Sequence, residues 1–147
     1  MTRSQAQASA ADAVGRHEPV LLERCLDLLA PAIEGAVSST SSTAPARPVM
    51  IDCTLGMGGH TDAALERFTT LKVVGIDRDP EAIALASARL ARFGDRFVAV
   101  QATYDAVSRV AHEHSVRAEG TVDAVLMDLG VSSLQLDEAD RGFAYSK

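Results

Sequence analysis

From Val49 onward, short apolar runs alternate with longer amphipathic segments. The runs are rich in valine, isoleucine and leucine, as buried strands are, and lie at residues 49–52 (VMID), 72–77 (KVVGID), 96–101 (RFVAVQ) and 122–130 (VDAVLMDLG). The segments between them predict helices at about 61–68, 80–93 and 104–115. Because parallel neighbours need crossover connections, this alternation predicts an α/β fold with a parallel sheet and helices on both faces.

The N-terminal third has a different pattern. Residues 1–16 are rich in alanine, serine and glutamine and are expected to form a mobile tail. A first helix is predicted at about Val20 to Leu29, with Pro31 beyond its end; its apolar face, at helical spacing, would consist of Val20, Leu21, Cys25, Leu28 and Leu29. Residues 35–48 are small and polar, and we expect them to form a flexible surface loop within one domain of residues 17–147.

The strand pattern stops early for a doubly wound sheet, which normally continues to five or more strands. After Asp128 the remaining residues contain no further strand and helix pair. The sequence therefore predicts a sheet truncated after about the fourth strand. Both a fragment of a longer protein and a minimal four-stranded half fit this pattern.

Ligands of doubly wound sheets bind beyond the carboxyl ends of the strands. The loop DCTLGMGGHT at 52–61 carries Gly58 and Gly59, which permit close backbone approach, and it leads into a helix N-terminus. Asp77 ends the second strand nineteen positions after Gly58, close to the spacing of about 20 at which an acid receives ribose hydroxyls. Together these residues favour a nucleoside-type ligand over a purely structural turn.

The third and fourth predicted strands each lead into one candidate. Tyr104 is placed to flank a flat ring, although a packing role is equally common for such a tyrosine. Asp128 follows mostly apolar residues and would be costly to bury unpaired, so we expect it to form hydrogen bonds. His112 and His114 face different sides of a helix, because residues two apart do not share a face, and we expect no metal site.

The glycine pattern narrows the choice of nucleoside. A dinucleotide fingerprint is G-x-G-x-x-G, and Thr61 stands where its third glycine belongs. A Walker loop needs G-K-[ST], which the loop lacks. The order of acid, glycine loop and strand-end acids resembles that of S-adenosylmethionine-dependent methyltransferases, and a nicotinamide-dependent oxidoreductase remains the weaker alternative.

Composition excludes some classes of protein. The 147 residues are 47% hydrophobic, enough for one globular core, and no apolar run approaches the roughly 20 residues that span a bilayer, so we expect no membrane helix. A net charge of −6 argues against a broad basic face for nucleic acid, although a local basic groove remains compatible with it. The N-terminus lacks a secretory signal, and two distant cysteines form no disulfide framework, which favours a cytoplasmic location.

Four motifs are more specific than the fold. HEPVLLERCLDLL, DCTLGMGGHT, GIDRDPEAIA and MDLGVSSLQLDEADRGF together resemble the bacterial ribosomal RNA small subunit methyltransferase H family, from about His17 to Phe143. The resemblance implies a Rossmann-like class I methyltransferase core that binds S-adenosyl-L-methionine. It also implies methylation of a cytosine exocyclic amine, with small-subunit ribosomal RNA or the assembled small subunit as partner.

The same resemblance implies a set of site residues. The methionine moiety of the cofactor would be held by Gly58, Gly59 and His60, its ribose by Asp77 and its adenine side by Tyr104, while Asp128 and Gln135 would complete the pocket. Asp128 is also the candidate catalytic residue, since acceptors that hold the amine protons assist transfer to a weakly nucleophilic nitrogen. Leu134 departs from the proline usual at this position in the family, which loosens the expected loop geometry near Gln135.

Family members continue for about as long again beyond the motif RGF, so the resemblance covers the cofactor half and not the RNA-recognition half. We therefore expect this chain alone to be inactive or severely weakened. A cofactor-binding half-domain without catalysis is the alternative. The sequence leaves the oligomeric state, including a homo-oligomer, open.

Overall fold

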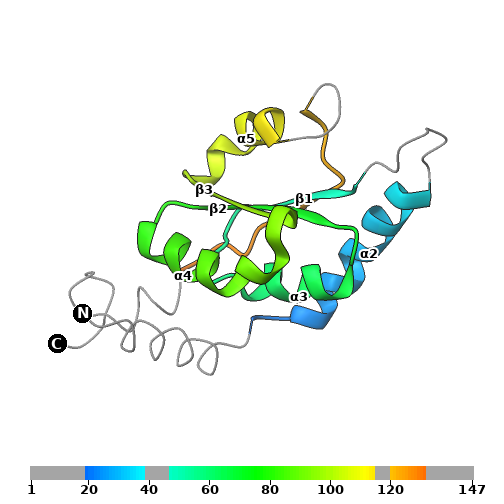
Figure 1. Cartoon of the computed structure of the whole chain (residues 1–147), viewed down its shortest axis with the longest axis horizontal. Helices are drawn as coiled ribbons and strands as arrows, with labels where there is room; N and C mark the ends of the chain where they lie inside the picture. The colour runs from blue at the N-terminus through cyan, green and yellow to red at the C-terminus, as the bar shows by residue number, and fades with distance from the viewer. Residues whose placement is uncertain (1–18, 39–46, 115–119, 132–147) are drawn as a thin grey trace.

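The computed structural model describes residues 19–38, 47–114 and 120–131 (Figure 1). Within these ranges the α-helices are α2 (Leu22–Ser38), α3 (Gly59–Arg67), α4 (Pro80–Leu90) and α5 (Val107–His114). The 3-10 helices are η1 (Ala91–Arg96) and η2 (Tyr104–Ala106), and the strands are β1 (Val49–Asp52), β2 (Lys72–Asp77), β3 (Phe97–Gln101) and β4 (Ala124–Leu126). The expected mobile tail, residues 1–16, lies outside the described residues.

The described strands form one parallel sheet in the order β3-β2-β1-β4. β1 pairs with β2 on one side and with β4 on the other, so Met50 lies between Val73 and Ala124. This order is that of the first half of a Rossmann-like sheet. The predicted fold class is confirmed, and all strand carboxyl ends meet at one edge.

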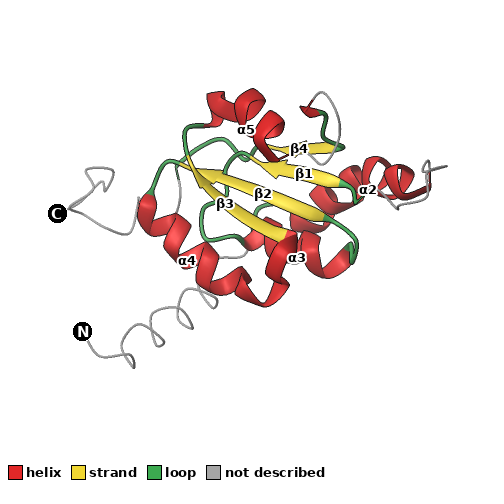
Figure 2. Cartoon of the chain, turned by 45° about the horizontal axis from the view of Figure 1, so that its top comes forward, coloured by secondary structure: helices red, strands yellow, loops and turns green. Residues whose placement is uncertain are grey.

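Alternate strand residues supply two separate cores, because successive side chains of a strand point to opposite faces. Met50 and Val73 pack in a cluster with residues of α2, α3 and α4, whereas Ile51 and Val74 pack in a second cluster with α5. Figure 2 shows α5 on one face of the sheet and α3 and α4 on the other. Burial from both faces explains why β1 reads as a continuous apolar run.

The first predicted helix was wrong in its end and in its buried face. α2 continues through Pro31 to Ser38, so residues 35–38 of the predicted flexible loop are helical, and residues 39–46 lie outside the described residues. Its buried residues are Leu26, Ala30, Ile33 and Ala36, while Leu28 is exposed. The added apolar turn offsets the helix hydrogen bond that Pro31 cannot donate.

The later elements correct smaller details. The helix predicted at 61–68 begins at Gly59, and the third predicted helix is divided into η2 and α5. The fourth strand, predicted over 122–130, ends at Leu126, because the next residues leave the sheet toward the glycine loop. Asp79 caps α4 as its side chain accepts the Glu81 N–H, with Pro80 in the first turn, as the sequence indicates. Within the described ranges, no helix combines the length and apolar character needed to cross a bilayer.

Candidate functional site

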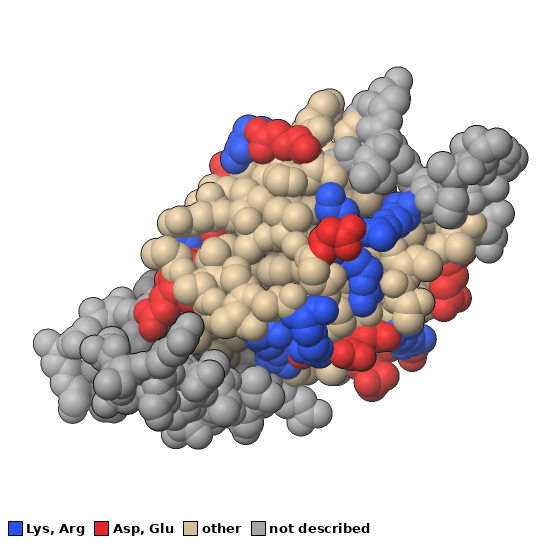
Figure 3. Space-filling view, viewed as in Figure 1, with Lys and Arg blue, Asp and Glu red and all other residues tan. Residues whose placement is uncertain are grey.

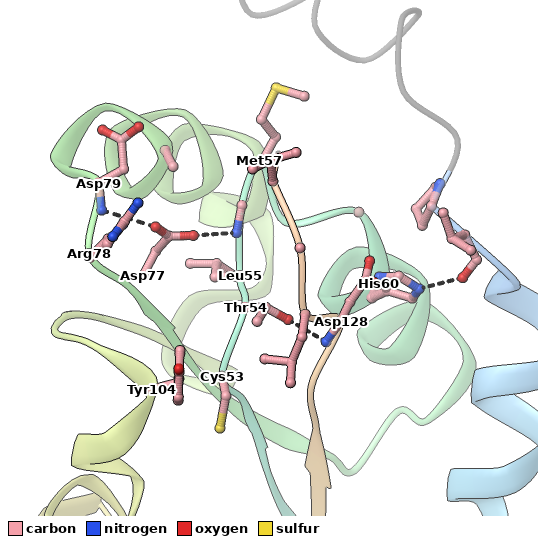
Figure 4. Close-up of a pocket in the computed structure, with 18 of the residues that line it drawn as sticks. Cys53, Thr54, Leu55, Met57, His60, Asp77, Arg78, Asp79, Tyr104 and Asp128 are labelled. Atoms are coloured by element: carbon pink, nitrogen blue, oxygen red, sulfur yellow. Dashed lines mark hydrogen bonds between the residues drawn. The ribbon is translucent and has the colours of Figure 1, made fainter. Parts of the chain in front are cut away.

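A pocket of about 540 Å³ opens at the carboxyl edge of the sheet (Figure 4). It is lined by the loops that follow β1, β2, β3 and β4, and by Pro19 and Val20, which precede α2. Its volume lies within the range of small-molecule sites. Of the residues named from the sequence, it brings together Gly59, His60, Asp77, Tyr104 and Asp128. Gln135 lies outside the described residues.

Asp77 joins the second strand to the glycine loop. One carboxylate oxygen accepts the Gly56 N–H at 2.8 Å, and the other accepts the Asp79 N–H at 3.0 Å. Both contacts are drawn in Figure 4. An ionised carboxylate offers about four acceptor positions, so each oxygen of Asp77 retains room for a further donor such as a ligand hydroxyl.

Each glycine of the loop is required for a different physical reason. Gly56 and Gly58 adopt φ values of +51° and +80°, which favour glycine. Gly58 is buried, and a Cβ there would lie 3.0 Å from Leu90 of α4. A Cβ on Gly59 would lie 2.5 Å from Pro19. Gly59 lines the pocket where Pro19 approaches closely, whereas Gly58 permits the turn and the close packing of the loop on α4.

His60 connects the helix α3 to the segment before α2. Its Nε2 lies 3.0 Å from the Val20 carbonyl oxygen, and because that oxygen can only accept, Nε2 carries the proton and donates. The ring is buried at 9% exposure, yet it lines the pocket. In the neutral ring, Nδ1 is then left as an acceptor.

Asp52 is a buried acid at the end of β1, directly before the lining residues Cys53 and Thr54. Its side chain accepts the Thr61 hydroxyl at 2.7 Å and the Thr54 N–H at 3.1 Å, and the residue is 1% exposed. Burial raises the pKa of this carboxyl above its ordinary value, although the hydrogen bonds from Thr61 and Thr54 act in the opposite direction. Thr61, which replaces the third glycine of a dinucleotide fingerprint, is thus a buried partner of Asp52.

Tyr104 and Asp128 stand on opposite loops of the site. Tyr104 begins η2 and is 57% exposed, so its ring is available at the pocket edge. Asp128 is exposed, so the cost of burial that led us to expect hydrogen bonds from it does not apply; its backbone N–H donates to Thr54 Oγ1 at 2.8 Å. The segment turns away from the sheet after Leu126, and this exposes the Asp128 carboxylate to the pocket side.

Sequence reasoning missed several residues that line the pocket. Pro19 and Val20, just before α2, line the site and contact the start of α3, and no local pattern marks that contact. Thr54 and Cys53 follow β1 directly, and their position alone could have marked them as candidates. Burial raises the pKa of the Cys53 thiol to about 11, which favours the neutral thiol.

The match to a family model decides the relationship. The model of the MraW methylase family matches residues 15–147. This chain belongs to the MraW methylase family. The resemblance read from the four sequence motifs is therefore confirmed.

Curated relatives of the MraW methylase chain carry the name ribosomal RNA small subunit methyltransferase H. Those of Kocuria rhizophila, Beutenbergia cavernae and Renibacterium salmoninarum are 57%, 53% and 54% identical over 92%, 93% and 89% of this chain. The chain spans only 37–38% of the length of these relatives. A solved geranyl diphosphate methyltransferase matches 48% of this chain and 26% of its own, at 20% identity and a TM-score of 0.36, too low to bear on function.

Proposed function

We propose that this chain carries the S-adenosyl-L-methionine-binding half of an enzyme that methylates the exocyclic amine of a cytosine in small-subunit ribosomal RNA. The observation that carries the proposal is the convergence of Gly59, His60, Asp77, Tyr104 and Asp128 on one pocket at the carboxyl edge of the sheet. The names of the relatives support the ribosomal RNA substrate class.

The lining residues suit the parts of this cofactor. Asp77 keeps acceptor positions for ribose hydroxyls beside its backbone contacts. The exposed Tyr104 ring offers a face for a flat base. Gly59 and His60 at the start of α3 would hold the amino-acid end, where backbone N–H groups favour a carboxylate. Gln135 belongs to the same proposal through the family resemblance.

When bound, the cofactor supplies an electrophilic methyl group. A cytosine amine is a poor nucleophile because its lone pair is delocalised into the ring, so acceptors for its protons assist transfer. Asp128 is our candidate for such an acceptor, because its carboxylate is exposed at the pocket. The substrate base must also be unstacked from its neighbours in the RNA to enter the pocket beside Asp128.

On the face seen in Figure 3, acidic and basic side chains of the described residues lie interspersed, in line with the net charge of −6. RNA binding depends on clustered Lys and Arg. We therefore propose that RNA contacts in the longer relatives involve residues beyond the matched part, and that this chain binds cofactor without efficient transfer. The 147-residue chain should incorporate little tritiated methyl into small ribosomal subunits.

Calorimetric titration tests the cofactor assignment. We expect the 147-residue chain to bind S-adenosylhomocysteine with a saturable heat and to give no comparable response to NAD. Binding of NAD without a response to S-adenosylhomocysteine would favour a nicotinamide-dependent oxidoreductase and overturn the proposal.

A further inference from the structure

We propose that Thr54 is a positioning residue that fixes the loop carrying Asp128 against the glycine loop. This inference rests on the proposed function for the role of Asp128, but the contact itself belongs to the structure. Thr54 Oγ1 accepts the Asp128 N–H at 2.8 Å, and the two residues are 74 positions apart. Figure 4 shows this bond crossing the pocket wall between the loops after β1 and β4.

Thr54 is itself held by a buried group. Its backbone N–H donates to one oxygen of Asp52, whose other oxygen accepts the Thr61 hydroxyl. Asp52 is 1% exposed and Thr61 is fully buried. A buried carboxylate with two donors is a rigid anchor, because losing either donor would leave it under-satisfied. The anchor therefore fixes the backbone from which the Thr54 hydroxyl projects.

The side chain of Thr54 adds further rigidity. Two heavy atoms on Cβ restrict χ1, so the hydroxyl has few alternative directions once the backbone is fixed. The chain of hydrogen bonds thus runs from Thr61 of α3 through Asp52 and Thr54 to Asp128. It joins the start of α3, the end of β1 and the loop after β4.

The loop after β4 needs such an anchor. β4 ends at Leu126, and residues 127–131 are all exposed. An exposed loop with few packing contacts is a low-stability element. The bond to Thr54 is made by the backbone N–H of Asp128, two residues past the end of the strand. It therefore fixes the position of the backbone that carries the Asp128 side chain. A role in packing alone would not depend on the hydroxyl.

The test compares variants of the 147-residue chain by amide hydrogen exchange and by titration with S-adenosylhomocysteine. Thr54→Val keeps the shape and removes the acceptor, whereas Thr54→Ser keeps the hydroxyl. We expect Thr54→Val to accelerate exchange of the Asp128 amide about fivefold or more, while the Gly56 amide, which Asp77 holds, is unchanged. The dissociation constant of S-adenosylhomocysteine should rise about fivefold in Thr54→Val. Thr54→Ser should stay within about twofold of the parent in both measurements.

Thr70→Val, at an exposed turn between α3 and β2, is the matched control and should change neither quantity. If Thr54→Val fails to fold, Thr54→Ala removes the same hydroxyl with a smaller side chain. Unchanged exchange at Asp128 in a folded hydroxyl-free variant would overturn the inference, as would faster exchange with unaltered affinity. If the parent chain does not bind S-adenosylhomocysteine, the proposed function fails, and the exchange data still decide whether Thr54 holds the loop.

Discussion

Both oxygens of Asp77 accept backbone N–H groups, which changes what its replacement would do. An alanine would remove the proposed ribose acceptor and also leave the N–H groups of Gly56 and Asp79 without their partner. Affinity and stability would then fall together. An asparagine retains one acceptor oxygen and so keeps one of the two backbone contacts, which makes its stability loss smaller than that of alanine.

We therefore predict that Asp77→Asn weakens S-adenosylhomocysteine binding about tenfold with a stability loss within about 1 kcal/mol, and that Asp77→Ala adds a loss of about 1–3 kcal/mol. Calorimetry and urea denaturation measure the two quantities. Asp95→Asn, an exposed partner of Arg47 away from the pocket, is the control and should leave affinity unchanged. Parent-like affinity in both Asp77 variants would show that the pocket is misassigned.

Asp52 carries a pH dependence of opposite sign to that of a salt-bridged acid. Burial raises the pKa of this carboxyl in the folded protein above 3.8, so the folded state binds more protons than the unfolded state above that pH. The tighter binding of this proton stabilises the folded protein. The stabilisation is fully present below the pKa of Asp52 in the unfolded chain and is lost as pH rises through its pKa in the folded protein. An asparagine at this position cannot titrate.

The stability of the parent minus that of Asp52→Asn should therefore fall as pH rises from about 4 through the folded pKa of Asp52. Urea denaturation of both chains at a series of pH values measures this difference. A difference that grows with pH would mean that the hydrogen bonds from Thr61 and Thr54 outweigh burial and lower the pKa instead.

Among the elements, α3 is joined to α4 and to the following η1 by an ion-pair cluster. Asp62 of α3, whose side chain is 15% exposed, accepts from Arg89 at 2.8 Å and from Arg92 at 2.5 Å, and Arg92 also donates to Glu66. Arg89 in addition lines the pocket. A largely buried acceptor with two cationic partners contributes more than an exposed pair.

Asp62→Asn should lower the free energy of unfolding by about 1–2 kcal/mol, because two arginines lose their counter-charge. Glu113→Gln is the matched control: it breaks an exposed pair with Arg109 one helical turn away, and the cost should be about 0.3–0.5 kcal/mol. Urea denaturation compares the two. Equal costs would mean that the cluster does not hold α3 to α4.

Some helices and strands could be predicted from local sequence patterns, and others could not. β1, β2 and the start of α4 follow from local signals, namely apolar runs and an Asp79-Pro80 cap. The end of α2 does not, because Pro31 is a local stop signal, and it is the burial of Ile33 in the core cluster beneath the sheet, with Ala36 also buried, that overrides it. The early end of β4 has no local signal either: past Leu126 the chain leaves the sheet, and the Asp128 N–H bonds to Thr54, 74 residues away.

The residues of the site can likewise be divided into those that local sequence signals indicate and those that depend on tertiary contacts. The strand-end positions of Asp77 and Tyr104 could be read from spacing, since parallel strands deliver their ends to one edge. His60 came from family resemblance, and its contact with Val20 is a tertiary feature without a local pattern. The roles of these residues toward a ligand remain predictions.

At the scale of the whole molecule, β4 forms an edge of the described sheet. Val125, Met127, Leu129 and Val131, at every second position along and beyond it, are 44–65% exposed. Edge strands with apolar side chains pair readily with other chains. Ligand measurements on the 147-residue chain therefore need low micromolar protein, with light scattering as a check on association.

The proposed function requires that the pocket at the carboxyl edge of the sheet bind S-adenosyl-L-methionine. Amide correlation spectra of the ¹⁵N-labelled chain, titrated with S-adenosylhomocysteine, measure this residue by residue. We predict saturable shifts at Gly56, Gly59, Asp77, Tyr104 and Asp128, with the amides of α5 unchanged. Shifts confined to α5, or no saturable shift at the pocket, would contradict the account.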